Sequence, residues 1–279
     1  MNATRPTASD DPGADGPDAD GPGAEVPASE ARTGERIAKW LARAGVASRR
    51  DVERLIAEGR VRRNNAPVTH PATFVEPGDL IQVNGALVEP PARTRLWRYH
   101  KPEGLVTTHR DPEGRPTVFE KLPPQLGRVV SVGRLDLNSE GLLLLTNDGA
   151  LARRLELPSN LWLRRYRVRV HGRPDPAALA ALARGITVEG VRYGAIEAGL
   201  DAVKGENAWL TVSLREGRNR EVRRVMIALG LKVSRLIRVA YGPFQLGNLP
   251  RGAVEEVQAR VLRDQLPREE SPVPITRGS

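Results

Sequence analysis

One aspartate in the middle of the chain, Asp136, has the surroundings of a catalytic carboxylate. It lies two residues after Arg134, between an apolar segment that ends at Val132 and a polar turn that leads into the leucine run 142–145. An acid at a strand-to-loop junction, beside a permanently charged guanidinium, stays ionised and can be aimed, which suits a nucleophile. Turn aspartates also commonly cap a helix or close an Asx-turn. This segment alone therefore leaves both interpretations open.

Two further segments carry side chains that could act with this carboxylate. Five arginines cluster in 214–226, around the start of a predicted helix. Positive charge there opposes the helix dipole, so the cluster is more easily explained if it faces an anion, either a carboxylate of the protein or phosphates of a ligand. Tyr166 shares one face of an alternating segment with Val168 and Val170. Its ring is either a core residue or a stacking group.

The composition excludes several classes of chemistry. The 279 residues contain no cysteine, which excludes disulfides, thiol catalysis and Cys-ligated zinc and makes a reducing cytoplasm the easiest compartment to assign. The four histidines (His70, His100, His109 and His171) lack the short spacings of a metal site, so we expect no metal. Neither a run of 18 apolar residues nor a signal sequence is present, so we expect a soluble protein that is not exported.

The charge is distributed unevenly. The formal net charge is +9, but residues 1–33 carry seven acidic residues and two arginines, which leaves +14 on the remainder. Such a basic body favours a polyanionic partner, most commonly nucleic acid. Of the 43 basic residues 38 are arginines, which add bidentate phosphate contacts and base stacking.

Composition and periodicity divide the chain into two domains and two tails. Residues 1–33 repeat Asp, Gly, Pro and Ala with almost no large apolar side chain, which predicts a disordered acidic tail. A small domain is expected at 34–90, a second domain at 95–264 after a proline-rich linker, and another disordered tail at 265–279.

The small domain begins with two short helical patterns separated by Gly45. The run 35–61, with Pro77-Gly78-Asp79 after it, resembles the S4 RNA-binding domain. The resemblance implies that basic side chains lie along an RNA backbone and position the protein without reading much sequence. The residues expected in this role are Arg36, Lys39, Arg43, Arg49, Arg50 and Arg60.

The second domain alternates many strand patterns with a few short helical ones. Strands are expected at 96–100, 129–132, 142–146, 162–170, 186–188, 191–203, 208–214 and 232–240, and helices at 117–122, 149–156, 175–184, 219–229 and 253–264. This pattern predicts an α+β domain built on a mixed, mainly antiparallel sheet flanked by helices.

The motifs of this domain, read together, resemble a known enzyme family. Gly133-Arg134-Leu135-Asp136, Tyr166 and the run 216–224 are similar to the three active-site motifs of the RsuA/RluB-type pseudouridine synthases, which usually carry an S4 domain ahead of them. The likeness extends from residue 35 to about 258, and the segments 111–118 and 233–242 are most similar to the RluB-type enzymes of 23S rRNA. The resemblance implies RNA isomerisation without a cofactor.

The resemblance also assigns catalytic roles. Asp136 matches the aspartate that acts as nucleophile or base to break the C1′–N1 bond of uridine before the ring turns and rejoins through C5. Tyr166 matches the tyrosine that stacks on the uracil and transfers the C5 proton. Arg223 matches the basic partner of the aspartate, and we expect it within ion-pair reach of Asp136.

Four further residues are expected to contact the substrate. Arg134 matches a position that fills the gap left by the flipped nucleotide, so its side chain should point to solvent. Leu236 matches the apolar residue beneath the base. Arg218 and Arg220 are expected to hold phosphates or to balance charge on the uracil.

The leading hypothesis is a monomeric enzyme that isomerises a specific uridine in 23S rRNA, free or in a pre-ribosomal large subunit. A non-catalytic S4-type ribosome-assembly factor is the alternative from another class, although a binding module has no need of a carboxylate that repels phosphates. The same chemistry on 16S rRNA is a third possibility.

Overall fold

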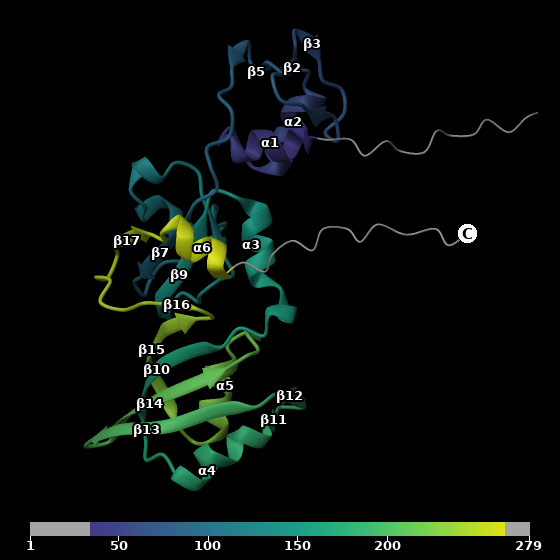
Figure 1. Ribbon diagram of the computed structural model, residues 1–279. Coiled ribbons are helices and arrows are strands. Elements are labelled where there is room, and N and C mark those ends of the chain that lie inside the picture. The colour runs from purple at the N-terminus through teal and green to yellow at the C-terminus, as the bar shows by residue number, and fades with distance from the viewer. Residues whose placement is uncertain (1–33, 266–279) are drawn as a thin grey trace, which may run out of the picture.

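The computed structural model describes residues 34–265 (Figure 1). The tails that the sequence predicts to be disordered lie outside this range, except for Gln265, which is the last residue of a helix. The N-terminal domain contains, in chain order, β1 (Glu35–Arg36), α1 (Ile37–Arg43), α2 (Arg49–Ala57), β2 (Val61–Arg63), β3 (Ala66–Pro67), β4 (Phe74–Val75), β5 (Ile81–Val83) and β6 (Ala86–Leu87).

The two helices and the short strands of this domain enclose a core of their own. Ile37 and Leu41 of α1 pack with Val52 and Ile56 of α2, and all four side chains are almost fully buried. Ser48 caps α2 by accepting a hydrogen bond from the backbone of Asp51 at 3.2 Å. The predicted pair of short helices is therefore observed, and the strands behind it form a four-stranded sheet in the order β3-β2-β5-β6.

The C-terminal domain is richer in strands. Its strands are β7 (Leu96–Lys101), β8 (Val130–Val132), β9 (Glu140–Thr146), β10 (Arg164–His171), β11 (Ile186–Val188), β12 (Val191–Tyr193), β13 (Ile196–Lys204), β14 (Asn207–Leu214), β15 (Lys232–Tyr241), β16 (Phe244–Gln245) and β17 (Val254–Glu256). Its α-helices are α3 (Gly149–Glu156), α4 (Pro176–Ala181), α5 (Glu221–Ala228) and α6 (Ala259–Gln265), and its 3-10 helices are η1 (Phe119–Lys121), η2 (Pro124–Leu126), η3 (Pro158–Asn160) and η4 (Leu182–Arg184). In the described part of the chain, no helix has the length and apolar character needed to cross a membrane.

A nine-stranded sheet organises this domain. Its main path runs β13-β14-β10-β15-β9-β7-β17, with β16 beside β15 and β8 beside β9. The contact between β9 and β15 is parallel, and the other pairings along the path are antiparallel. The predicted α+β class with a mixed, mainly antiparallel sheet is confirmed.

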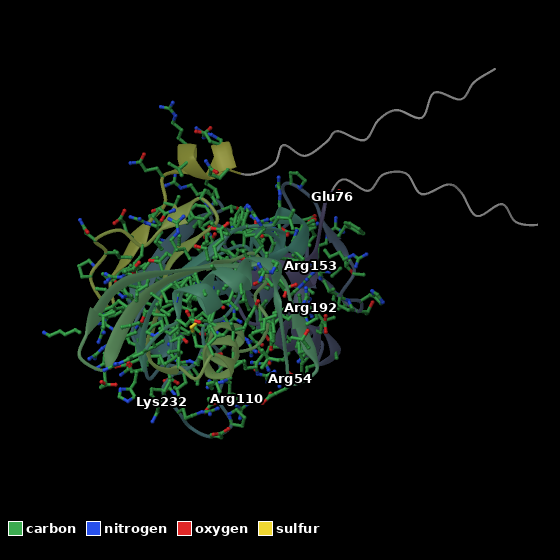
Figure 2. The ribbon with its side chains drawn as sticks, turned by 90° about the horizontal axis from the view of Figure 1, so that it is seen from below. Arg54, Glu76, Arg110, Arg153, Arg192 and Lys232 are labelled. Carbon is green, nitrogen blue, oxygen red and sulfur yellow. The ribbon has the colours of Figure 1, made fainter. Side chains whose placement is uncertain are left out.

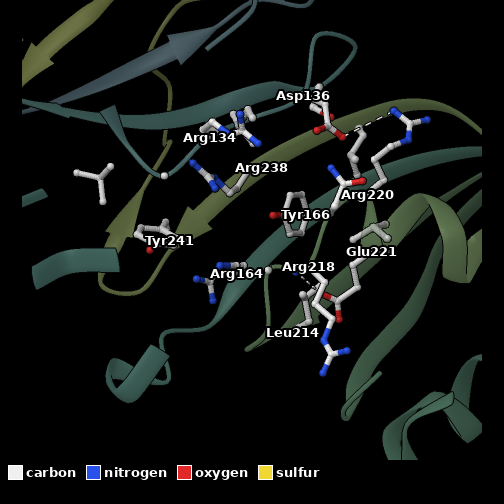
Figure 3. Close-up of a pocket in the computed structure, with 18 of the residues that line it drawn as sticks. Arg134, Asp136, Arg164, Tyr166, Leu214, Arg218, Arg220, Glu221, Arg238 and Tyr241 are labelled. Atoms are coloured by element: carbon white, nitrogen blue, oxygen red, sulfur yellow. Dashed lines mark hydrogen bonds and ion pairs between the residues drawn. The ribbon is translucent and has the colours of Figure 1, made fainter. Parts of the chain in front are cut away.

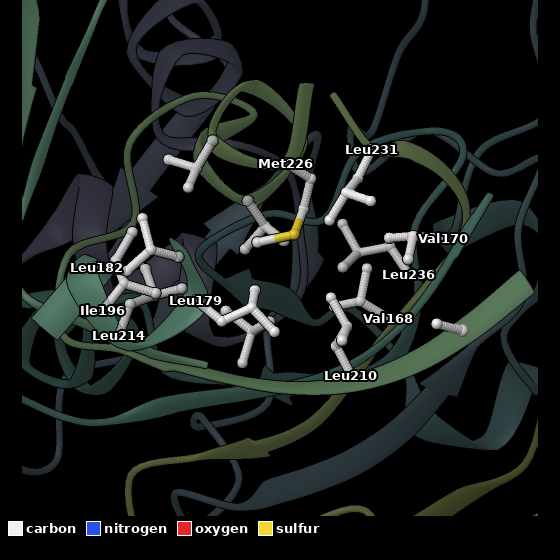
Figure 4. Close-up of a cluster of buried hydrophobic side chains, with 14 of the residues drawn as sticks. Val168, Val170, Leu179, Leu182, Ile196, Leu210, Leu214, Met226, Leu231 and Leu236 are labelled. Carbon is white, nitrogen blue, oxygen red and sulfur yellow. The ribbon is translucent and has the colours of Figure 1, made fainter. Parts of the chain in front are cut away.

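Apolar side chains form separate cores on either side of the β9–β15 contact. One core packs β10, β14 and β15 against α4 and α5, with Val168, Leu210 and Met226 fully buried (Figure 4). Another packs β7 and β9 against α3 and α6, with Leu142 and Leu144 fully buried. The centre of the sheet, where the two parts meet, is therefore rigidly supported from both sides.

Gly141 allows the two parts to approach at this contact. Its backbone has φ +106°, and a Cβ atom built on it would lie 2.3 Å from the carbonyl oxygen of Arg238. A side chain at position 141 would push β9 away from β15. The approach of these strands therefore requires glycine.

Three predicted elements differ from those observed. The helix expected at 253–264 is wrong in its first half, because Val254–Glu256 forms β17 on β7 and the helix begins at Ala259. The helix expected at 117–122 is a single 3-10 turn, Phe119–Lys121. The strand expected at 191–203 divides into β12 and β13, because the chain leaves a small hairpin and joins the main sheet.

Candidate active site

The register of β10 and β15 brings the candidate residues to one face of the sheet. Tyr166 lies opposite Arg238, and Val168 lies opposite Leu236. Residues directly opposite each other on antiparallel strands point to the same side. The aromatic ring, the apolar side chain of Leu236 and a guanidinium therefore stand next to one another at the centre of the sheet.

These side chains line a pocket of about 570 Å³ (Figure 3). Its walls come from the loop after β8, from β10 and β15, and from the segment that leads into α5. Of the residues predicted from the sequence, it contains Arg134, Asp136, Tyr166, Arg218, Arg220 and Leu236. Segments about 100 residues apart along the chain thus meet as the motifs predicted.

The loop that carries Asp136 is held by its backbone at several points. Gly133, with φ +66°, donates its N–H to the carboxylate of Glu156 at 2.5 Å. The hydroxyl of Thr107 donates to the carbonyl of Leu135 at 2.9 Å, and the N–H of Ser139 donates to the carbonyl of Asp136 at 3.0 Å. The Asp136 side chain itself is about one third exposed, at 34%. A fixed backbone thus presents an accessible carboxylate to the pocket.

A buried lysine, which the sequence analysis did not identify, supports the same loop from behind. Lys101, at the end of β7, is fully buried, and its Nζ lies 3.2 Å from the carbonyl oxygen of Asp136 and 2.8 Å from that of Ser139. Burial lowers the pKa of Lys101 to about 8, although the charge of Asp136 opposes the shift. The signal in the sequence is a lysine that follows Trp97 and Tyr99 at alternating positions, in a chain whose cations are nearly all arginines.

The cation paired with Asp136 is Arg220. Its Nη1 lies 3.8 Å from Oδ2 of Asp136, and Figure 3 shows the pair at one end of the pocket. Arg220 precedes α5 and has a left-handed backbone, with φ +52° and ψ 27°. Such a conformation is uncommon for a residue with a Cβ atom, and strained residues of this kind tend to cluster at functional sites.

The predicted direct ion pair between Arg223 and Asp136 is wrong. Arg223 lies one turn further along α5, is buried, and donates from Nη2 to the carbonyl oxygen of Asn138 at 2.7 Å. Burial and the neighbouring Arg220 lower its pKa, while the charge of Asp136 partly offsets them. Arg223 therefore holds the backbone of the Asp136 loop, and the carboxylate is left to Arg220.

Tyr166 and Leu236 form the apolar side of the pocket. Tyr166 is half-buried against the α4–α5 core, and its hydroxyl makes no hydrogen bond with any residue in the described range. Leu236 is buried, with 6% of its surface exposed. The ring thus combines a fixed position with a free hydroxyl, as a stacking or proton-transferring group requires.

Comparison with known proteins identifies the fold and its activity. The family model of the RNA pseudouridylate synthases matches residues 95–228, and that of the S4 domain matches residues 35–81. A protein of Rickettsia felis named as an uncharacterized RNA pseudouridine synthase is 47% identical over 228 residues, which cover 82% of this chain and 99% of the relative. The chain belongs to the RNA pseudouridine synthase family.

Two further comparisons agree with this assignment. The ribosomal large subunit pseudouridine synthase B of Salmonella typhi is 45% identical over 249 residues, covering 85% of this chain and 86% of the relative. A crystal structure of a pseudouridylate synthase superposes with a TM-score of 0.56 at 26% identity, covering 82% of this chain and 98% of the other. The resemblance to RsuA/RluB-type enzymes with an S4 domain is thus confirmed, and the chain is an enzyme.

The pseudouridine synthase pocket holds the remaining predicted side chains in different ways. Arg134 is exposed at the rim, as expected. Arg218 pairs with Glu216 at 3.0 Å and lies over the ring of Tyr193 at 5.9 Å. Among the described residues, no group of three or more His, Asp or Glu is placed to hold a metal ion.

The S4 domain of the synthase presents its predicted RNA contacts unequally. Four of the six, Arg36, Arg49, Arg50 and Arg60, are exposed. Lys39 and Arg43 instead pair with Glu35 at 3.0 and 2.9 Å. Further cations lie at the surface of both domains, as Figure 2 shows for Arg54, Arg110 and Arg192. Arg60 also pairs with Glu58 at 2.9 Å. The structure therefore leaves Arg36, Arg49 and Arg50 as the better candidates for phosphate contacts.

Arg43 has a second partner that links the two domains. Its Nε lies 3.8 Å from Oδ2 of Asp148, the residue that caps the N-terminus of α3 in the catalytic domain. The same carboxylate accepts a hydrogen bond from Thr94, in the linker, at 2.9 Å. Arg43 therefore connects the S4 domain to the catalytic domain, and its contact with RNA stays a prediction.

Proposed function

We propose that this pseudouridine synthase converts one specific uridine of 23S rRNA to pseudouridine, with Asp136 as the catalytic nucleophile or base on a flipped-out nucleotide. The observation that carries the proposal is the shared pocket of Asp136, Arg220 and Tyr166, which contains an ionisable acid, its cation and a stacking ring. A uridine stacked in a helix cannot present its glycosidic bond to a carboxylate, so the nucleotide must leave the stack.

The residues of the pocket suit each step of an isomerisation. Asp136 acts at the ribose as the C1′–N1 bond breaks, and the guanidinium of Arg220 lies 3.8 Å from its carboxylate. The detached uracil turns between Tyr166 and Leu236, and C5 then bonds to C1′. The C5 proton is finally lost, and N1 carries a proton, so the product is an isomer of the substrate. The free hydroxyl of Tyr166 is the proposed route for the C5 proton.

The large ribosomal subunit is proposed from the relatives. Proteins named ribosomal large subunit pseudouridine synthase B in Salmonella typhi and Pasteurella multocida are 45% and 46% identical to this chain. We place the reaction in the cytoplasm, where the enzyme acts as a monomer on 23S rRNA or on a pre-ribosomal large subunit. The exposed arginines of the S4 domain then bind the RNA backbone near the target.

Mapping pseudouridines in 23S and 16S rRNA from strains with and without the gene tests this proposal. We expect one pseudouridine of 23S rRNA to disappear on deletion and to return with a plasmid copy. Loss of a pseudouridine in 16S rRNA instead would assign the same chemistry to the small subunit, and an unchanged map of both RNAs would contradict the proposed substrate.

A further inference from the structure

The pocket continues beyond Asp136 and Tyr166 to a second positively charged end. Figure 3 shows the guanidinium of Arg238 between Arg134 and Tyr241, on the side of Tyr166 away from Arg220. Arg238 is 4% exposed, so its charge is almost completely removed from solvent. It lies opposite Tyr166, on the face of β15 that also carries the buried Leu236.

Two nitrogens of this buried guanidinium have no hydrogen-bond partner in the described range. Nε of Arg238 donates to the carbonyl oxygen of Leu142 at 2.8 Å, but Nη2 makes no hydrogen bond with any residue of the described range. A buried charged donor without an acceptor is unfavourable. Nη2 is itself closed off from the pocket, but Nη1, which also makes no hydrogen bond with a described residue, is not enclosed in this way and can donate to a ligand in the pocket that Arg238 lines.

The surroundings of Arg238 favour an anion. Arg164, on the adjacent strand, stacks on one ring of Tyr241 as Arg238 does, each at 5.0 Å from the ring centroid. Arg134 adds a third positive charge at the rim. The opposing carboxylate that lines this end, Glu156, accepts the N–H of Gly133 and is exposed to solvent. Three guanidinium groups thus face one carboxylate.

Hydrogen bonds to the backbone hold Arg164 and the ring of Tyr241 in place, as expected for a binding site. The side chain of Arg164 donates from Nη1 to the carbonyl oxygen of Trp162 at 3.2 Å and to that of Arg215. The hydroxyl of Tyr241 donates to the carbonyl oxygen of Leu155 at 3.2 Å. Both guanidinium groups are therefore fixed before a ligand arrives, which reduces the entropy lost on binding.

We propose that Arg238 and Arg164 form a phosphate subsite that holds the RNA backbone phosphate next to the flipped uridine. The proposal rests on the proposed function only in that the ligand is an RNA whose uridine enters the pocket beside Tyr166. A phosphodiester oxygen supplies an acceptor for Nη1 of Arg238. Holding the phosphate at a fixed distance from Asp136 positions the ribose for attack.

A scan with neutral linkages tests the subsite. The probes are short RNAs with a single central uridine, each with one phosphodiester replaced by a methylphosphonate, and the dissociation constant is measured for each. With the wild-type enzyme we expect one linkage next to the uridine to weaken binding about tenfold or more when it is neutralised. With the Arg238→Gln variant, neutralising that linkage should no longer change the dissociation constant. The effects of neutralising the other linkages should be the same as in the wild type.

Control variants separate the subsite from general charge and from folding. Arg153→Gln removes an exposed arginine of α3 that does not line the pocket, so it should keep the dependence on that one linkage. If Arg238→Gln does not fold, judged by its melting temperature, Arg164→Gln takes its place with the same expectation. The subsite would be overturned if neutralising that linkage weakened binding equally in the wild type and in the folded variant. It would also be overturned if no neutral linkage weakened binding by the wild type. The probes are independent of 23S rRNA, so an incorrect target would not affect this result.

Discussion

Arg220 places Nη1 3.8 Å from Oδ2 of Asp136 and does so from a left-handed backbone conformation. The contact joins the loop before β9 to the residue before α5, so it closes one end of the pocket, where the proposed reaction places the glycosidic bond. Both side chains keep access to the pocket, with 47% of Arg220 and 34% of Asp136 exposed. An exposed ion pair contributes little to folding stability, and its role is more easily explained by catalysis.

Replacement of Arg220 by glutamine should reduce activity and leave the fold intact. The carboxylate loses its cation, and we expect kcat/KM to fall about 10- to 100-fold, equivalent to about 1.4–2.8 kcal/mol. The melting temperature should change little because the pair is exposed. The assay measures pseudouridine formation in an rRNA transcript under single-turnover conditions.

Arg224→Gln is the matched control for this change. Arg224 is exposed in the first turn of α5, outside the pocket lining, so its variant removes the same charge from a position close to Arg220 in the chain. If the two variants lose activity equally, the effect is a general loss of positive charge and the assignment of Arg220 is wrong.

We expect Lys101 to make kcat/KM decline at alkaline pH. Its pKa of about 8 in the folded state lies below the ordinary 10.5, chiefly because of burial. Above pH about 8 the ammonium group loses a proton and one of its donors to the loop of Asp136, so kcat/KM should decline. Stability changes in the other direction: between pH 8 and 10.5 the unfolded chain binds the proton and the folded chain does not, so this group increases the free energy of unfolding as pH rises.

Profiles of kcat/KM against pH for Lys101→Met and Lys121→Met check this expectation. Lys121 is exposed, so its variant should keep the decline near pH 8. Lys101→Met should be less active at every pH and should lack that inflection. An unchanged inflection in Lys101→Met would show that another group titrates there.

Local periodicity was sufficient for most elements of the catalytic domain. The helix predicted at 149–156 is observed as Gly149–Glu156, because an aspartate cap and an apolar stripe specify it locally. The end of the chain was predicted less well. Val254–Glu256 is a strand because it pairs with β7, more than 150 residues earlier in the chain, and no local pattern contains that partner.

The candidate site shows the same limit at single residues. Motif resemblance predicted Arg223 as the basic partner of Asp136, whereas the structure places Arg220 beside the carboxylate. The choice depends on the backbone of Arg220, whose positive φ turns its side chain toward the carboxylate, while Arg223 is directed to the loop backbone. Arg238 was missed, although its sequence signal is a charged residue on the inward face of a strand.

The most direct test of the central claim is the pseudouridine content of rRNA from a deletion strain that expresses Asp136→Asn. Asparagine keeps the size of the side chain and removes its charge, so the protein should fold and accumulate at the wild-type level. We predict that the pseudouridine restored by the wild-type gene remains absent with Asp136→Asn. Restoration of that pseudouridine by the variant would contradict the assignment of Asp136 as the catalytic residue.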